Sequence, residues 1–281
     1  MGFSIGVLTG LFGVGGGFLV VPLLNILLGV PYEIAVGSSL GFILITSLTA
    51  LPGHLKQGNF ELKAVLGLGA GSVGGAILGD IVQDFLIQTV AQGSPRVFQQ
   101  WMHGFFLLLL VLTSLLLLLP DQSRTQKGPA LSGFRTPLQR ISVPPYIHLD
   151  KENLPRVSLT GLLLLGLLVG TLTGLMGVGG GVLFMPILLL VVGLRPKLAV
   201  GTSLGVVIVA SFAGIVKKMM AGTPKVSLPL TFGLLAGSLV GVQVGLWICR
   251  RIRGEQIRRY FVFVIFLALG LILWDLWKNG S

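Results

Sequence analysis

Long apolar runs constrain this chain more than any other feature. Residues 104–119, 157–176 and 260–274 consist of apolar side chains, glycine and a few hydroxyl residues. A helix that crosses the roughly 30 Å hydrocarbon core of a bilayer needs about 20 such residues. Charged residues make up only 10% of the 281 residues, and hydrophobic residues 53%, which leaves too little charge for the surface of a soluble domain. The sequence therefore predicts an all-α polytopic membrane protein.

Two thirteen-residue stretches interrupt the apolar sequence with adjacent glycines. "GLFGVGGGFLVVP" occupies residues 10–22 and "GLMGVGGGVLFMP" residues 174–186, and nine of their thirteen positions are identical at a constant offset of 164. The segments "AVGSSLG" (residues 35–41) and "AVGTSLG" (residues 199–205) match at the same offset. We therefore expect two homologous transmembrane repeats, residues 1–119 and 157–281, joined by an extramembrane linker at residues 120–156.

Each half is predicted to contain the same four segments: a glycine-broken segment, a helix that opens near the V-G-[ST]-S motif, a helix dotted with glycine, and a helix rich in Leu and Phe. They are residues 2–28, 34–51, 62–82 and 98–119 in the first half, and residues 157–192, 198–220, 226–248 and 256–277 in the second. Glycine recurs every four residues in each third segment (Gly67, Gly71, Gly75 and Gly79; Gly233, Gly237, Gly241 and Gly245). This spacing predicts close packing of helices in lipid.

The 20 Lys and Arg residues indicate how the halves are oriented. If every segment crosses the membrane fully, these residues divide 12 to 8 between the two sides. If each glycine-broken segment is re-entrant, they divide 15 to 5, with the linker and the "RRIRGEQIRR" loop (residues 250–259) on the richer side. The positive-inside rule favours the second arrangement, so we expect inverted repeats with a cytoplasmic linker. The arm at residues 157–176 is itself long enough to cross, which favours the first.

The adjacent glycines suggest an anion site. Non-helical backbone at membrane depth is tolerated only where protein or a wet cavity satisfies it, and a short helix after such a break would point its N-terminal N–H groups at the break. Helix N-termini attract anions, and glycine lets a ligand approach the backbone. The candidate substrate-binding residues are Gly15, Gly16, Gly17, Ser38, Ser39, Gly179, Gly180, Gly181, Thr202 and Ser203. The alternatives are a packed kink for the glycines, and caps or helix–helix hydrogen bonds for the hydroxyls.

The distribution of charge favours an anion over a cation as the substrate. All nine acidic residues fall at or near the predicted ends of the spans, whereas a cation carrier is expected to bury acids within them. His54, Lys56, Lys217 and Lys218 follow the second segments and form a candidate anion-attracting vestibule. The alternative is that they set topology and snorkel to the interface. The net charge of +11 lies in short clusters between spans, so the expected partner is the lipid bilayer and not nucleic acid.

Motifs for chemistry are missing from the sequence. It contains no P-loop and no HExxH motif, and Cys249 is its single cysteine, so ATP hydrolysis, that zinc site and a CxxC redox site are excluded. No enzyme activity, metal or cofactor is therefore expected. The Leu- and Phe-rich helices could face lipid or a second protomer, so a homodimer is one expected assembly.

The paired GLxGVGGGxLxxP motifs, the AVG[ST]SLG motifs and "GHLKQGNFEL" at residues 53–62 resemble the TauE/SafE sulfite exporter family of integral membrane transporters. The resemblance covers both halves outside the linker. It implies a secondary transporter in a bacterial inner membrane that exports a small sulfur-containing anion, sulfite or an organosulfonate such as sulfoacetate, and it implies that the motif residues bind this substrate. An anion channel on the same repeats is the alternative; an intramembrane enzyme or electron carrier is a third possibility.

Overall fold

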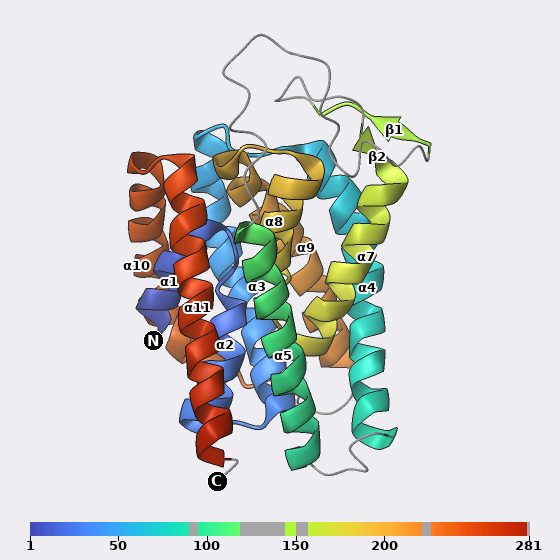
Figure 1. Ribbon diagram of the computed structural model, residues 1–281, viewed down its shortest axis with the longest axis vertical. Coiled ribbons are helices and arrows are strands. Elements are labelled where there is room, and N and C mark those ends of the chain that lie inside the picture. Colours follow the sequence, from blue (N-terminus) through green and yellow to red (C-terminus); the bar gives the residue numbers. More distant parts are fainter. Residues whose placement is uncertain (90–94, 119–143, 150–156, 221–225, 280–281) are drawn as a thin grey trace.

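The computed structural model describes residues 1–89, 95–118, 144–149, 157–220 and 226–279. Within these residues, seven helices are long and apolar enough to cross a membrane, and they stand side by side in one elongated bundle (Figure 1). They are α3 (Tyr32–Lys56), α4 (Leu62–Thr89), α5 (Pro95–Leu118), α7 (Leu159–Met176), α9 (Pro196–Met220), α10 (Leu228–Arg251) and α11 (Gly254–Asn279). The predicted all-α polytopic architecture is confirmed.

The glycine motifs divide the first segment of each half. The first motif separates α1 (Gly2–Phe12) from α2 (Gly17–Pro22), and the second separates α7 from α8 (Gly181–Pro186). Both short helices end in proline, which has no N–H group and disrupts the α-helical ladder. The chain then continues as the π-helical stretches η1 (Leu23–Leu27) and η3 (Ile187–Val192). The predicted glycine-broken helices are therefore present.

The predicted boundaries differ from the structure mainly in the third segment. We expected that helix to end at residue 82, whereas α4 extends to Thr89, because the polar residues after Asp80 continue the helix instead of ending it. Of the linker, residues 144–149 are described, and β1 (Tyr146–Ile147) pairs antiparallel with β2 (Val157–Ser158). Linker residues 120–143 and 150–156 lie outside the described residues.

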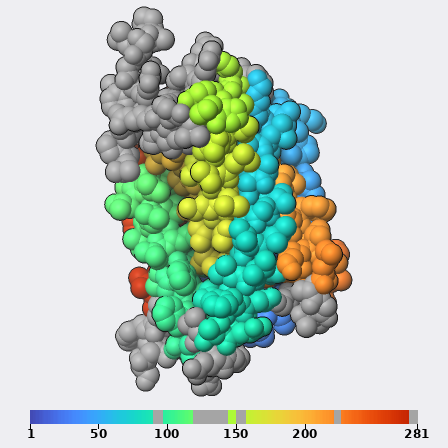
Figure 2. Space-filling model, turned by 90° about the vertical axis from the view of Figure 1, so that its right-hand side faces the viewer, coloured from blue at the N-terminus to red at the C-terminus, as the bar shows by residue number. Residues whose placement is uncertain are grey.

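The first helix of each half packs against a helix of the other half. α1 lies along α10, and α7 lies along α4, as Figure 2 shows for the second pair. The helices approach so closely that a Cβ atom at Gly75 would collide with the carbonyl oxygen of Leu167, and one at Gly241 with that of Phe3. Most of the predicted packing glycines lie in these two contacts. Gly233 is an exception, because a Cβ there would meet open space.

The equivalent helices α3 and α9 run antiparallel. Leu40, early in α3, meets Gly214, late in α9. Ser47, later in α3, and Val207, earlier in α9, both converge on Gly15. As α3 proceeds, its contacts on α9 therefore move backwards along the chain.

The second glycine-broken segment turns the chain back along the bundle. α4 runs parallel to both α9 and α7, as the contacts of Val65 with Gly205, Gly69 with Val209, Gly67 with Leu162, and Gly79 with Thr171 indicate. The helices α7 and α9 consequently begin at the same end of the bundle. The chain leaves α7 at the glycine break inside the bundle, so α8 and η3 must bring it back before α9 begins, as Figure 1 shows.

Candidate substrate site

The glycines of the two motifs hold a backbone shape that other residues rarely adopt. Gly15 and Gly16 have φ angles of 71° and 72°, and Gly179 and Gly180 have 71° and 68°. This left-handed conformation is unfavourable for residues that carry a Cβ atom. Residues 13–16 and 177–180 therefore form four-residue breaks between two helices, and are not simple kinks within one helix.

The last glycine of each triplet is required for a different reason. Gly17 and Gly181 begin α2 and α8. A Cβ atom at Gly17 would lie 2.7 Å from the carbonyl oxygen of Val178, and one at Gly181 would collide with the carbonyl oxygen of Val14. Each short helix thus starts against the break of the other half. The structure brings the two motifs, 164 residues apart in sequence, together in the centre of the bundle.

Backbone N–H groups of the breaks are buried without a backbone acceptor. Gly15, Gly16, Gly179 and Gly180 are all buried. Within the described part of the chain, no backbone carbonyl accepts a hydrogen bond from their N–H groups. Buried N–H groups are nearly always paired in native proteins, so these four donors are available to a ligand that reaches them. In this conformation all the break residues are buried.

The second hydroxyl of each V-G-[ST]-S motif holds the opposite break in place. The Ser39 hydroxyl lies 2.6 Å from the carbonyl oxygen of Gly177, and the Ser203 hydroxyl lies 2.8 Å from that of Gly13. Each hydroxyl also lies 2.8 Å from a carbonyl oxygen of its own helix. Because a hydroxyl has one proton, these contacts occupy its donor, and the pair links the two halves.

The first hydroxyl of each motif accepts a backbone hydrogen bond. The Ser38 hydroxyl accepts from the N–H of Ser227, just before α10, at 2.9 Å. The Thr202 hydroxyl accepts from the N–H of Glu61, just before α4, at 3.1 Å. All four predicted hydroxyls therefore serve helix–helix or capping contacts here, the alternative named above. Their role in substrate binding stays a prediction.

Two residues of the proposed vestibule lie inside the protein. His54 is fully buried, and its Nε2 atom lies 3.1 Å from the carbonyl oxygen of Gly10. Lys218 is 1% exposed, and its ammonium group lies 2.6 Å from Oδ1 of Asp80 and 2.5 Å from Oε1 of Gln83. The charge of Lys218 is thus compensated locally by a carboxylate. That position does not suit the long-range attraction of anions.

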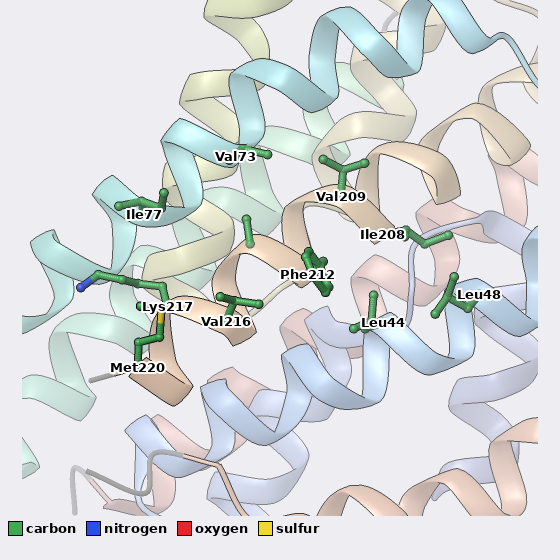
Figure 3. Close-up of a pocket in the computed structure, with 11 residues that line it drawn as sticks. Leu44, Leu48, Val73, Ile77, Ile208, Val209, Phe212, Val216, Lys217 and Met220 are labelled. Atoms are coloured by element: carbon green, nitrogen blue, oxygen red, sulfur yellow. The ribbon is translucent and has the colours of Figure 1, made fainter. Parts of the chain in front are cut away.

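The remaining vestibule residues lie at the surface. Lys56, in the last turn of α3, is exposed, and Lys217 is half-buried. Lys217 stands at one end of a groove between α3, α4 and α9 (Figure 3). The groove has a volume of about 670 Å³, and its other lining side chains, among them Leu44, Ile77 and Phe212, are apolar. Such a surface suits lipid acyl chains better than an anion.

Sequence reasoning missed several buried polar groups. Asp80 was expected near the end of a span, but it lies within α4 and is 1% exposed. Ser47 and Ser211 are fully buried on α3 and α9. The repeat offset of 164 relates these two serines, so a longer alignment of the halves would have found them. The glycines of the third segments are related by 166 residues, and at that offset from Asp80 stands Leu246, so the repeat gave no signal for the ion pair.

Comparisons with known proteins agree with the sequence motifs. The family model described as "Sulfite exporter TauE/SafE" matches residues 1–272. The probable membrane transporter protein MJ0441 of Methanocaldococcus jannaschii is 27% identical over 92% of this chain and 87% of its own length. Two probable membrane transporter proteins of Bacillus subtilis, YunE and YjnA, are 27% and 29% identical over 95% and 97% of this chain and 93% and 97% of their own lengths. No solved structure matches the chain.

The family match extends over both glycine motifs, both V-G-[ST]-S motifs and all seven long helices. The relatives are covered over nearly their whole lengths, so the likeness concerns the complete bundle and not one repeat. From its motifs, its fold and this match, the chain belongs to the TauE/SafE sulfite exporter family of membrane transporters.

Proposed function

We propose that the protein is a secondary transporter that exports a small sulfur-containing anion, sulfite or an organosulfonate such as sulfoacetate. The anion would bind between the two glycine breaks, where the N–H groups of Gly15, Gly16, Gly179 and Gly180 have no backbone acceptor among the residues that the structure describes. The meeting of the two breaks at the buried centre is the observation that carries the proposal. Two discontinuous helices that meet near the midplane are a recurrent arrangement in repeat transporters.

The proposed site can hold an anion without a fixed arginine. A hydrogen bond to a charged group contributes about 1.5–3 kcal/mol, so a few N–H groups suffice for a small oxyanion. The short helices α2 and α8 direct their positive N-terminal ends toward the same region. Because the breaks are buried, the bundle must open on one side to admit the anion. Alternating opening toward the two sides of the membrane would then produce transport.

The proposal includes inverted repeats with a cytoplasmic linker in a bacterial inner membrane. The antiparallel course of α3 and α9 supports inverted repeats. The 15-to-5 division of Lys and Arg in the re-entrant arrangement supports a cytoplasmic linker. A cysteine at Ser132, in a chain whose Cys249 is replaced by alanine, tests it. An impermeant maleimide should label this cysteine only after the inner membrane is opened. Labelling from the periplasm of intact cells would contradict the orientation.

Counterflow in proteoliposomes tests the transport function. Vesicles that contain the purified protein and unlabelled sulfite should take up ³⁵S-sulfite faster than vesicles without internal sulfite, and the uptake should saturate. Methanesulfonate and sulfoacetate should compete with sulfite, and chloride should compete poorly. If no sulfur oxyanion enters saturably, the proposed function is wrong. A current that follows voltage, with no counterflow, would indicate the alternative, an anion channel.

Substitution of the glycines is a poor test of this site. At Gly180 a side chain would sit in a left-handed conformation, with its Cβ atom 2.6 Å from Oγ1 of Thr173 and from a ring carbon of Phe184. These contacts predict that Gly180→Val distorts the break itself, so a loss of binding would not identify the ligand site. Side chains that face the breaks offer a cleaner test.

A further inference from the structure

Two serine hydroxyls inside the bundle have no hydrogen-bond partner. Ser47 on α3 and Ser211 on α9 are both 0% exposed, and the Oγ atom of each lacks a hydrogen-bond partner among the described residues. Among the buried Ser and Thr residues in the described part of the chain, these two alone share that property. Burial of a hydroxyl without a partner opposes folding, so each such group in a native protein requires an explanation.

Other buried hydroxyls in the bundle donate hydrogen bonds to carbonyl groups of their own helix. A Ser or Thr inside a helix commonly donates to the carbonyl three or four residues earlier. Thr46, the residue before Ser47, donates to Phe42 at 2.8 Å, and Ser72 on α4 donates to Gly69 at 2.8 Å. Ser47 and Ser211 make no such bond to their own helices. Their hydroxyls are therefore directed away from the helix backbone.

Ser47 lies beside the first glycine break. A Cβ atom built at Gly15 would lie 3.3 Å from the Ser47 hydroxyl, and the same position is approached by Ile43 and Val207. Ile43 is one helical turn before Ser47, and Val207 is one turn before Ser211. Ser47 thus lies on the helix face that lines the first break, and Ser211 lies one turn beyond Val207, which contacts the same break.

The two serines are equivalent positions of the repeat. Ser211 follows Ser47 by 164 residues, the offset that relates the two glycine motifs. Because α3 and α9 run antiparallel, Ser47 and Ser211 lie in opposite directions from the point where Ile43 and Val207 both contact the first break. The same unpaired hydroxyl occurs at the equivalent position of both repeats, which indicates a common functional role.

We infer that Ser47 and Ser211 are substrate ligands, whose hydroxyls donate hydrogen bonds to the oxygens of a small oxyanion held between the glycine breaks. The inference rests on the proposed function and assigns two further residues to the same site. An anion with several oxygens, such as a sulfite or a sulfonate, can accept from both hydroxyls and from the break N–H groups at once.

Binding to three serine variants tests the inference. Sulfite and methanesulfonate are titrated calorimetrically into the parent, Ser47→Ala, Ser211→Ala and, as a matched control, Ser72→Ala, all purified in detergent. Loss of one hydrogen bond to an anion should weaken affinity roughly 10- to 100-fold for Ser47→Ala and Ser211→Ala. Ser72→Ala removes an equally buried helix hydroxyl on α4 and should leave affinity unchanged.

Thermal unfolding without anion separates a ligand role from a structural one. Ser47→Ala and Ser211→Ala break no hydrogen bond of the protein, so their unfolding midpoints should equal or exceed that of the parent. Ser72→Ala loses its bond to Gly69, and its midpoint should fall. Ser47→Thr keeps the hydroxyl and should retain most of the affinity that Ser47→Ala loses.

Failure of the inference can be told apart from failure of the proposed function. If the parent binds neither anion, the proposed function fails, and the inference falls with it. If the parent binds and both alanine variants bind equally well, the serines are not ligands, although the function stands. A lower midpoint for both alanine variants, with affinity unchanged, would likewise overturn the inference.

Discussion

The buried pair of Lys218 and Asp80 allows a sharp prediction about stability. Their side chains are 0% and 1% exposed, and the ammonium nitrogen lies 2.6 Å from the carboxylate. Replacement of either partner alone leaves an uncompensated charge in the low-dielectric interior. Breaking a buried pair in this way costs about 3–5 kcal/mol. We expect that loss for Lys218→Met and for Asp80→Asn.

The double variant should behave differently from the sum of the two single variants. Asp80→Asn with Lys218→Met removes both charges together, and uncharged replacements of a buried ion pair are often neutral or stabilising. The two single losses sum to about 6–10 kcal/mol, and the double variant should cost far less than that sum, so the coupling between the residues should exceed about 3 kcal/mol, the upper end of the usual range for residues in contact. Lys217→Met is the matched control, because Lys217 is the adjacent lysine and is only half-buried. Its effect should stay within about 0.5 kcal/mol.

Thermal unfolding in detergent, followed by tryptophan fluorescence, measures these differences. One kcal/mol shifts the midpoint by about 2–4 °C in a protein of this size, so each single variant should unfold roughly 6–20 °C below the parent. The double variant should recover most of that shift. The reasoning is refuted if the double variant loses as much as both single variants combined, or if Lys218→Met and Lys217→Met unfold alike.

Three further predictions follow from the packing and the surface charges. Ser203→Ala removes the hydroxyl that holds the first break, so the free energy of unfolding should fall by about 1–3 kcal/mol; an unchanged midpoint in detergent would contradict this role. Gly75→Ala places a Cβ atom against the backbone of α7 and should destabilise the bundle, whereas Gly104→Ala meets open space and should be neutral or gain up to about 1 kcal/mol in the same assay. Replacement of Lys56 and Lys217 by glutamine should raise the apparent KM of uptake at low salt and have little effect at high salt, because salt screens exposed charges over about 8 Å at physiological ionic strength. A salt-independent loss of uptake would place these residues in the site itself.

Most of the architecture could be predicted because the sequence contains the same series of segments in each of its two halves. The eight segments and the two breaks follow from apolar run length, from glycine spacing and from a constant offset, and all of these are local or periodic signals. The positive φ angles at Gly15 and Gly16 follow from the same logic, since three adjacent glycines are costly in an ordinary helix.

The buried polar groups could not be predicted in the same way. Lys218 and Asp80 lie 138 positions apart and occur in non-equivalent places of the two halves, so neither periodicity nor the repeat connects them. The predicted helix at residues 62–82 was also too short, so it placed Asp80 near a helix end and hid its burial. The roles of Ser39 and Ser203 depend on which backbone carbonyl lies opposite, and only the three-dimensional contact between the halves decides that.

The exchange of first helices between the halves has a consequence for biosynthesis. α1 leaves the ribosome first, but its partner α10 begins only at Leu228. At roughly 5–20 residues per second, α1 waits about 10–45 s for that partner. During this interval the glycine face of α1 has no α10 to pack against, and the first break lacks its hydrogen bond from the Ser203 hydroxyl. The N-terminal repeat therefore lacks the contacts that position its break, and the two breaks meet only after the helices of the second repeat have packed against those of the first.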